Sequence, residues 1–295
     1  MKIETKIFGH RGYPAKFAEN SLEGFEYALE NGADGIEFDV HLTKDQVPVV
    51  MHDEKINRTT DGKGNIKDYT HEELQQFHLE NGETIPDLKD VFELIEKHDA
   101  LANLEFKTDK YEYRGIEEIV LNMAREYEFK HPLIYSSFNL QTMLRCLAID
   151  KDLDCNWLVY RKIADPEKVV SDNGLSGIHP NEYHDFDGIQ RIWTIDDEKE
   201  AKELMEKNVA GIFTNDFVKM NELRTRCEAE RLLPRTQLNN DKNTCRDGAN
   251  FLFLGQSAKI SLEFTDKEPI FANLSVSKPH FTDKPTFSGD LSVNF

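Results

Sequence analysis

The sequence contains little cysteine and no long hydrophobic run. Its four cysteines, Cys146, Cys155, Cys227 and Cys245, lack the paired spacing of a zinc site or of a disulfide framework. No apolar segment approaches the roughly 18 residues that a membrane-spanning helix requires. The amino terminus also lacks the apolar segment of a secretory signal. We therefore expect a globular cytoplasmic protein that does not insert stably into a membrane.

Basic residues are scarce relative to acidic ones. Lys and Arg total 36 against 55 Asp and Glu, which gives a formal net charge of -19. Most of such a surface repels a phosphate backbone, so nucleic acid is excluded as a partner and anionic membranes are disfavoured. A small-molecule substrate is the expected partner, and a homo-oligomer stays open.

The chain does contain a regular alternation of short β-prone runs and helical segments, which is typical of parallel βα units. Eight runs qualify as strands, at residues 6–9, 35–40, 102–107, 132–137, 154–159, 176–179, 190–195 and 211–214. Eight such strands with helices between them predict an α/β fold, the (β/α)8 TIM barrel.

Two helices have recognisable starts. Asn20 is followed three residues later by Glu23, and Thr70 by Glu73. This spacing places a side-chain acceptor at the cap and a carboxylate at the third position of a helix. We expect helices to begin at Asn20 and Thr70, and the first of them to end at the Asn31-Gly32 pair.

One segment interrupts the alternation after the second strand. Residues 43–46 are too few for a helix and lead into an apolar run at 47–51, so the two runs should form an antiparallel hairpin. Folding back across this turn brings His52 level with Glu37. Together with the irregular stretch that follows, the hairpin predicts a small insertion at about residues 41–86.

The chain divides into two parts of different character. Residues 1–234 carry the alternation and are the expected barrel. Residues 235–295 show period-two alternation of apolar and polar residues without helical patterns, which is typical of short strands. We expect a small β-rich tail there, in which no chemical motif identifies a role.

Charged and titratable residues gather where the predicted strands end. Functional side chains of such a barrel lie at the carboxyl ends of its strands, and residues two apart in a strand share a face. The candidates are His10, Arg11, Glu37, Asp39, His52, Glu105 and Lys107. Singly, each is most often a solvated charge. Burial of the whole set inside a barrel costs several kcal/mol per charge unless the charges pair or bind a ligand.

This set suggests phosphoryl-transfer chemistry. Three carboxylates in one barrel mouth, Glu37, Asp39 and Glu105, repel one another unless a cation lies between them, and hard oxygen ligands favour Mg²⁺ or Ca²⁺. Arg11 and Lys107 are cations able to hold a phosphate. His10 and His52 titrate near neutrality and suit proton transfer. Five other histidines, His41, His71, His78, His98 and His131, are expected at the surface.

Several motifs, in order, resemble the short bacterial form of the glycerophosphodiester phosphodiesterase family. They are Gly9-His10-Arg11-Gly12, Glu19-Asn20-Ser21, residues 32–40, Val49-Val50-Met51-His52-Asp53, Leu104-Glu105-Phe106-Lys107, Ser136-Ser137-Phe138, Ile192-Trp193-Thr194 and residues 211–216. The resemblance implies metal-dependent hydrolysis of glycerophosphodiesters to glycerol 3-phosphate and an alcohol, with an insertion that caps the glycerol side.

The resemblance also implies a role for each matching residue. His10 and His52 correspond to the acid/base pair, and Glu37, Asp39 and Glu105 to the metal ligands. Arg11 and Lys107 correspond to the phosphate-binding cations, while Phe138 and Trp193 line the mouth as apolar walls for the substrate. His179 and Asn181, at the end of the predicted strand 176–179, match no family motif and are further candidate substrate contacts.

Two other functions compete with hydrolysis of glycerophosphodiesters as interpretations of the sequence. A phospholipase D-like or C-like activity on lysolipids or phosphoinositides requires an apolar rim around the mouth, which the predicted insertion does not supply. A binding module or catalytically idle barrel predicts loss of at least one member of the charged set, yet all seven are present.

Overall fold

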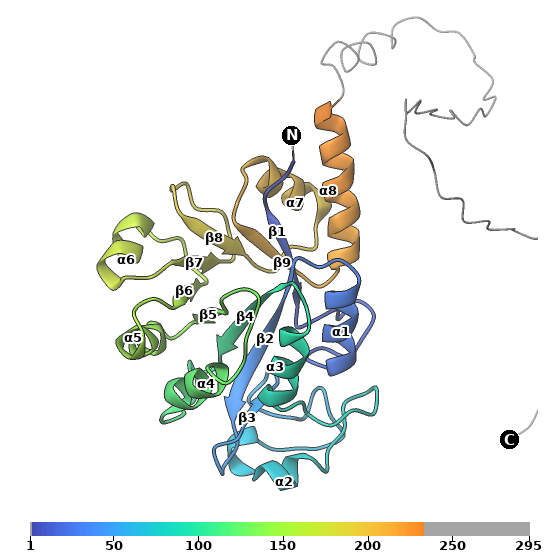
Figure 1. Cartoon of the computed structure of the whole chain (residues 1–295), viewed down its shortest axis with the longest axis vertical. Helices are drawn as coiled ribbons and strands as arrows, with labels where there is room; N and C mark the ends of the chain where they lie inside the picture. Colours follow the sequence, from blue (N-terminus) through green and yellow to red (C-terminus); the bar gives the residue numbers. More distant parts are fainter. Residues whose placement is uncertain (1, 233–295) are drawn as a thin grey trace, which may run out of the picture. The chain divides into compact units, whose positions relative to one another are not determined.

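A computed structural model describes residues 2–232, which form a closed parallel barrel (Figure 1). Its strands are β1 (Lys6–His10), β2 (Gly35–Leu42), β4 (Leu101–Phe106), β5 (Ile134–Ser137), β6 (Asp154–Val159), β7 (Gly177–Pro180), β8 (Ile189–Ile192) and β9 (Gly211–Thr214). They neighbour one another in this order, and β9 pairs with β1 to close the ring. The predicted TIM barrel is confirmed. The β-rich tail predicted at 235–295 lies outside the described residues.

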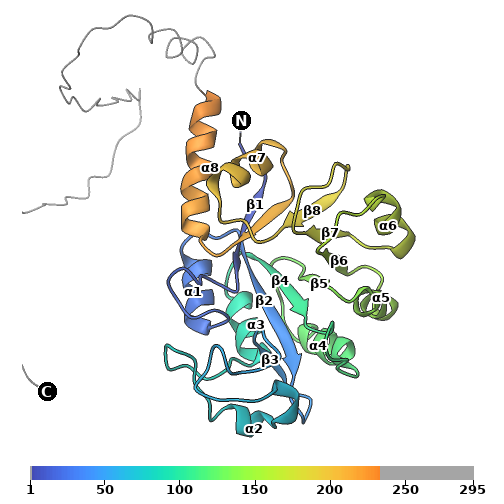
Figure 2. The same cartoon turned by 180° about the vertical axis from the view of Figure 1, so that it is seen from behind.

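Helices lie around the outside of the strands in both views of the molecule (Figures 1 and 2). They are α1 (Leu22–Glu30), α2 (His71–Leu74), α3 (Leu88–Glu96), α4 (Ile116–Ala124), α5 (Leu140–Ile149), α6 (Pro166–Asn173), α7 (Glu198–Glu206) and α8 (Phe217–Leu232), with a 3-10 turn at Ile66–Asp68. The alternation fails once, because β7 is joined to β8 by residues 181–188 without a helix.

The first helix begins one residue later than expected. The capping box predicted at residues 70–73 is present at α2, whereas the cap of α1 is Ser21, whose Oγ accepts a hydrogen bond from the backbone N–H of Gly24. Asn20 instead donates its side-chain amide to Asp39 Oδ2 over 2.9 Å. The expectation for Asn20 was wrong because a buried carboxylate on β2 uses its side chain.

The insertion after β2 is confirmed as a hairpin followed by an irregular segment with its own small core. The strand β3 (Pro48–Val50) pairs antiparallel with β2 outside the ring, and the backbone N–H of Met51 donates to the Asp39 carbonyl over 3.0 Å. The chain therefore runs back along β2 toward the site residues, as expected, although the register, when continued, places His52 opposite Phe38, one residue from Glu37. Buried side chains beneath it form a separate cluster: Ala18, Val49, Met51, Ile56, Ile66, Leu74, Leu79 and Ile85.

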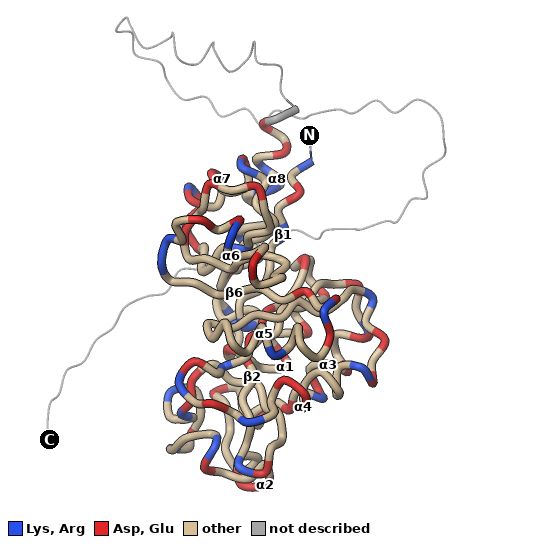
Figure 3. Tube along the Cα trace, turned by 90° about the vertical axis from the view of Figure 1, so that its left-hand side faces the viewer, with Lys and Arg blue, Asp and Glu red and all other residues tan. Residues whose placement is uncertain are grey.

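Acidic positions recur along the outer helices, including α2, α4 and α7 (Figure 3). This distribution agrees with the acidic composition of the chain, because these charges, apart from the buried Glu117 of α4, remain in contact with solvent. Within residues 2–232, none of the helices combines the length and the hydropathy needed to cross a membrane.

One histidine expected at the surface is fully buried. His41, near the end of β2, exposes 0% of its surface. Its Nε2 lies 3.2 Å from the carbonyl oxygen of His52, to which it donates, and its Nδ1 lies 3.0 Å from the hydroxyl of Tyr113. Burial lowers the pKa of His41 from 6.5 to about 4. This residue therefore anchors the backbone of the hairpin at His52.

We expect the free energy of unfolding to fall as the pH drops from about 6.5 toward 4. In this range the unfolded chain binds a proton at His41 that the folded protein does not, which costs about 1.4 kcal/mol per pH unit. The variant His41→Gln keeps an amide donor for the His52 carbonyl but does not titrate. Urea unfolding at several pH values should show a shallower dependence for His41→Gln. Parallel curves would contradict the assignment, and His78→Gln at a half-exposed site is the control.

Candidate active site

One pocket of about 210 Å³ collects most of the predicted site residues at the carboxyl ends of the barrel strands. Its lining comprises His10, Arg11, Glu37, His52, Asn103, Glu105, Ser136, Phe138, Leu158, Tyr160, His179, Trp193, Thr194 and Phe213. Asp39 and Lys107 lie behind this lining, and Lys107 Nζ is 2.7 Å from Glu105 Oε1 and 3.4 Å from Asp39 Oδ1. Asn181 is exposed and lies outside the lining.

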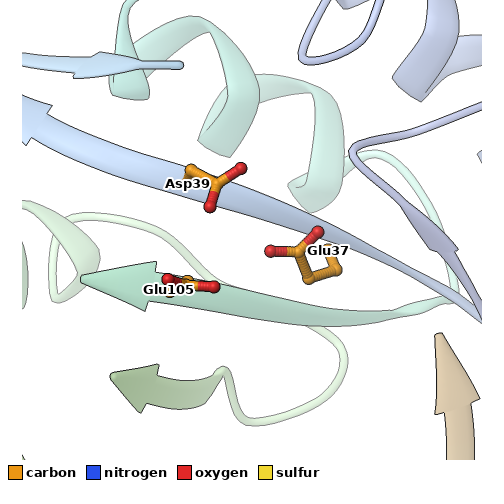
Figure 4. A group of neighbouring side chains, drawn as sticks. All are labelled: Glu37, Asp39 and Glu105. Carbon is orange, nitrogen blue, oxygen red and sulfur yellow. The ribbon is translucent and has the colours of Figure 1, made fainter. Parts of the chain in front are cut away.

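Three of the predicted residues form a buried carboxylate cluster. Glu37 and Asp39 share one face of β2, and Asp39 is the register partner of Glu105 on the adjacent strand β4. Figure 4 shows the three side chains converging from these two strands. One oxygen from each lies within 4.8 Å of the others, and each residue exposes 7% or less of its surface. Among the described residues, this cluster can hold a metal ion.

Electrostatics in the cluster favour a bound cation. Burial and the charges of Asp39 and Glu105 raise the pKa of Glu37 well above 4.5, and burial raises the pKa of Glu105 to about 7. Burial also disfavours the charged form of Asp39, but Lys107, His52 and Arg11 lower its pKa below the usual value. Asp39 Oδ1 accepts no hydrogen bond, and Lys107 Nζ pairs with it by charge at 3.4 Å. Three oxygen ligands, one of them free of hydrogen bonds, fit a hard divalent cation such as Mg²⁺ or Ca²⁺.

Two basic side chains flank the carboxylates. Arg11 Nε lies 3.7 Å from Asp39 Oδ2, and the backbone N–H of Arg11 donates to Glu37 Oε2 over 3.0 Å. Burial disfavours the charged form of Lys107, but Glu105 and Asp39 more than compensate and raise its pKa above the usual value. Both side chains therefore carry a positive charge next to the pocket.

His10 presents its Nε2 atom to the pocket. Its Nδ1 donates over 2.9 Å to Asn215 Oδ1, and Asn215 is oriented by donating its amide to Asp196 Oδ2 over 2.7 Å. His10 Nε2 lies 3.9 Å from Glu37 Oε2. Burial and the neighbouring Arg11 lower the pKa of His10 to about 4, so the ring is neutral at neutral pH and Nε2 can accept a proton.

His52 is oriented by a carboxylate that a single arginine holds in place. His52 Nδ1 lies 2.8 Å from Asp53 Oδ1 and donates to it. The guanidinium of Arg58 donates to Asp53 over 2.7 Å and to Glu19 over 2.6 and 2.8 Å, and Glu19 also accepts from Arg11 over 3.1 Å. This chain of polar contacts connects both flanks of the pocket.

Sequence reasoning did not assign the residues that orient the two histidines. Asp53 and Glu19 belong to motifs that carried the resemblance, and their position beside site residues was the available signal. Asn215 also belongs to such a motif, at residues 211–216, whereas Arg58 lies outside the motifs and had no signal for this role.

Aromatic side chains form the opposite flank of the pocket. The rings of Phe138 and Tyr160 are stacked with their centroids 4.4 Å apart, and Trp193 meets both edge-on at 5.4 and 5.1 Å. Tyr160 is 65% exposed. Phe138 and Trp193 line the pocket, and their contact with a substrate stays a prediction. Tyr160 was missed, although it follows the carboxyl end of β6.

A closed (β/α)8 barrel with carboxylates, cations and histidines at the carboxyl ends of its strands defines the TIM-barrel class of enzymes. Comparison with known proteins narrows this class. The model of the Glycerophosphoryl diester phosphodiesterase family matches residues 10–219. This chain belongs to that family, as its motifs indicated.

Individual relatives agree with this assignment. A glycerophosphodiester phosphodiesterase of Bacillus altitudinis is 36% identical over 231 residues, covering 72% of this chain and 94% of the relative. A crystal structure of a glycerophosphodiester phosphodiesterase from Parabacteroides distasonis has a TM-score of 0.68 and 27% identity, covering 78% of this chain and all of that one. A structure of an Oleispira antarctica phosphodiesterase, in complex with the product sn-glycerol-3-phosphate, has a TM-score of 0.66 and 26% identity, covering 74% and 96%.

We expect Mg²⁺ or Ca²⁺ to raise the melting temperature by roughly 5–10 °C over that in EDTA, because an ion that binds only the folded protein stabilises it. The variant Glu37→Gln should lose most of this response, since it removes one oxygen ligand. Its metal-free stability should not fall, because the substitution also relieves repulsion within the cluster. Differential scanning calorimetry with each metal and with EDTA measures both effects. An equal response of wild type and Glu37→Gln would exclude the cluster as the metal site, with exposed Glu118→Gln as the control.

Proposed function

We propose that the protein is a metal-dependent phosphodiesterase that hydrolyses glycerophosphodiesters to glycerol 3-phosphate and an alcohol. The observation that carries this proposal is the convergence of His10, His52, Arg11 and two carboxylates of the acidic cluster on one pocket. The names of the relatives and the product bound to the Oleispira antarctica enzyme support the substrate class. Residues 1–234 are the proposed catalytic barrel, located in the cytoplasm, and residues 235–295 have no assigned role.

The charged flank of the pocket holds the phosphate in this proposal. Arg11 and Lys107 attract the phosphoryl oxygens and offset the charge that develops on them. Glu37, Asp39 and Glu105 hold the divalent ion, which supplies further positive charge for the same purpose when it is bound. Pairing of Lys107 with Asp39 and Glu105 keeps its ammonium group beside the cluster.

The two histidines exchange protons with the reacting oxygens. Both rings are held at Nδ1 by an acceptor, so each offers Nε2 to the substrate. Asp53 is a carboxylate and stabilises a protonated His52, whereas the partner of His10 is the neutral amide of Asn215. We therefore assign His52 as the acid that protonates the leaving alcohol. His10 is then the base that removes a proton from the attacking oxygen, which is water or the neighbouring glycerol hydroxyl.

Replacing either histidine should abolish turnover without unfolding the protein. His10→Ala and His52→Ala remove a proton-transfer group, which contributes about 10²–10⁴-fold to the rate. Release of glycerol 3-phosphate from glycerophosphocholine and glycerophosphoethanolamine, with Mg²⁺, Ca²⁺ or EDTA, measures the effect. Circular dichroism checks the fold, and His78→Gln is the control. A near-normal rate in either alanine variant would remove that histidine from the mechanism.

The pH dependence of the rate should distinguish acid from base. Burial, together with the charges of Lys107 and Arg11, lowers the pKa of His52 below 6.5, and the hydrogen bond to Asp53 opposes this shift. Asp53→Asn therefore lowers the pKa of His52 further. A general acid must be protonated, and its rate falls as the pH rises through its pKa. The alkaline limb of the kcat profile should therefore move to lower pH in Asp53→Asn, and kcat should fall about tenfold or more. A shift of the acidic limb instead would make His52 the base. Asp99→Asn, which breaks the exposed pair with His131, is the matched control.

A second candidate activity is a phospholipase D-like or C-like hydrolysis of lysolipids. The aromatic flank of Phe138, Tyr160 and Trp193 favours this activity. It gives the pocket the apolar rim that the insertion does not supply, and Tyr160 in it is 65% exposed. Hydrolysis of lysophosphatidylcholine at a rate comparable to that of glycerophosphocholine would support this activity.

A further inference from the structure

One more histidine, His179, lies in the pocket, opposite the carboxylates. His179 is on β7, and the order of strands around the ring places β7 directly across the barrel from β2, which carries Glu37 and Asp39. His179 lines the pocket at its floor and exposes 0% of its surface. No step of the proposed mechanism uses it.

The hydrogen bonds of His179 fix which ring nitrogen carries the proton. Arg191 Nη1 lies 3.2 Å from His179 Nε2, and a guanidinium can only donate. Nε2 is therefore the acceptor, and the proton of the neutral ring is on Nδ1. Arg191 is itself held by Asp154 Oδ2 and Asn156 Oδ1, each at 3.3 Å, and Asn156 is oriented by donating to Asp154 Oδ1 over 2.8 Å.

Burial and the neighbouring Arg191 lower the pKa of His179 well below 6.5. The ring therefore stays neutral across the physiological range, and its tautomer does not change. The result is a fixed donor, the Nδ1–H group, at the floor of the pocket.

This donor has no hydrogen-bond partner. His179 Nδ1 is one of the buried polar atoms without a partner in the described part of the chain, and Asn103 Oδ1 is another. Asn103 lines the same pocket, exposes 1% of its surface and uses its amide group to donate to Ser136 over 3.0 Å. Buried polar atoms in native proteins are normally paired, so an unpaired donor and an unpaired acceptor in one pocket point to a ligand.

We propose that the Nδ1–H group of His179 donates a hydrogen bond to a hydroxyl group of the diester, with Asn103 as the complementary acceptor. The chemistry of the two unpartnered atoms favours a hydroxyl, because a hydroxyl both accepts and donates. A phosphoryl oxygen only accepts, and a quaternary ammonium group does neither. The phosphate is also drawn to Arg11 and Lys107, whereas His179 lies across the ring from the carboxylates that these cations flank.

Two aromatic side chains contact His179. The ring of Phe213 lies 5.2 Å from the imidazole, and the indole N–H of Trp193 is occupied by the carbonyl oxygen of His179 over 2.7 Å. A hydroxyl-bearing arm of the substrate would thus lie against aromatic rings with its oxygen directed to the floor. This inference rests on the proposed function and adds to it a determinant of substrate preference.

Two variants separate the donor of His179 from its structural contact. The amide of His179→Asn reaches the place of Nδ1 and keeps the donor, but leaves Arg191 without its acceptor. The amide of His179→Gln reaches the place of Nε2 and keeps the acceptor for Arg191, but removes the donor. Melting temperature should therefore be higher for His179→Gln, whereas affinity for hydroxyl-bearing diesters should be higher for His179→Asn.

The measurement compares KM values for glycerophosphoglycerol, which has hydroxyls in both arms, and bis(4-nitrophenyl) phosphate, which has none. The ratio of the first KM to the second should rise about tenfold in His179→Gln and less in His179→Asn. Glycerophosphocholine has hydroxyls in its glycerol arm alone, so it shows which arm of the diester contacts His179. A rise in its KM in His179→Gln places the glycerol arm at His179, and no rise places the alcohol arm there. An unchanged ratio in His179→Gln, or losses in both variants that follow their stability, would overturn the inference.

Failure of the proposed function gives a different result. In that case the wild type releases no glycerol 3-phosphate from either glycerophosphodiester. Calorimetry then compares the binding of sn-glycerol 3-phosphate by His179→Gln and by His179→Asn, a measurement that requires no turnover. Weaker binding by His179→Gln than by His179→Asn supports the role of His179, and equal binding overturns it.

Discussion

The burial of three carboxylates side by side is the constraint on which the rest of this site depends. Glu37, Asp39 and Glu105 lie on adjacent strands with almost no exposed surface, and each buried charge costs several kcal/mol unless it is compensated. The surrounding contacts supply that compensation in part, through the ammonium of Lys107 and the guanidinium of Arg11. The requirement extends even to a helix end, because Asn20 donates to Asp39 and leaves the capping of α1 to Ser21. A divalent ion would complete the compensation, which is why the cluster is better understood as a binding site than as a stabilising feature.

A second set of contacts couples the insertion to the barrel. Arg58 is part of the insertion, and through Asp53 and Glu19 it connects His52 to Arg11 at the end of β1. The insertion is packed around a buried cluster of apolar side chains, so its backbone can hold these polar side chains in place. Exposed ion pairs contribute little to stability, and Arg58 is half exposed. Its contribution is therefore orientation of the two flanks of the pocket relative to each other, which a catalytic pair of histidines requires.

Much of the site could be predicted because its residues follow strand periodicity. Residues two apart in a strand lie on the same face. The closeness of Glu37 to Asp39, and of Glu105 to Lys107, could therefore be predicted from the positions of the strands alone. The contacts of Arg58 with Glu19, of Asn215 with His10 and of Arg191 with Asp154 could not be predicted, since each joins segments that are far apart in the sequence. The burial of His41 was missed for a related reason. His41 shares the strand face of Glu37 and Asp39, and its ring is covered by Tyr113 and by the backbone at His52, contacts that a single sequence does not show.

The two sides of the barrel interior differ in what they offer a ligand. The β1, β2 and β4 side presents fixed charges of both signs, whereas the β5 to β9 side presents aromatic rings and a few neutral hydrogen-bonding groups. Arg191 is the exception on the second side, but its charge is balanced by Asp154 and its donors are occupied by Asn156 and His179. Charge can therefore bind the phosphate on the first side while the second side distinguishes between alcohols by shape and by hydrogen bonds. Such a separation lets one barrel keep its chemistry while its preference for the uncharged arm is set by different residues.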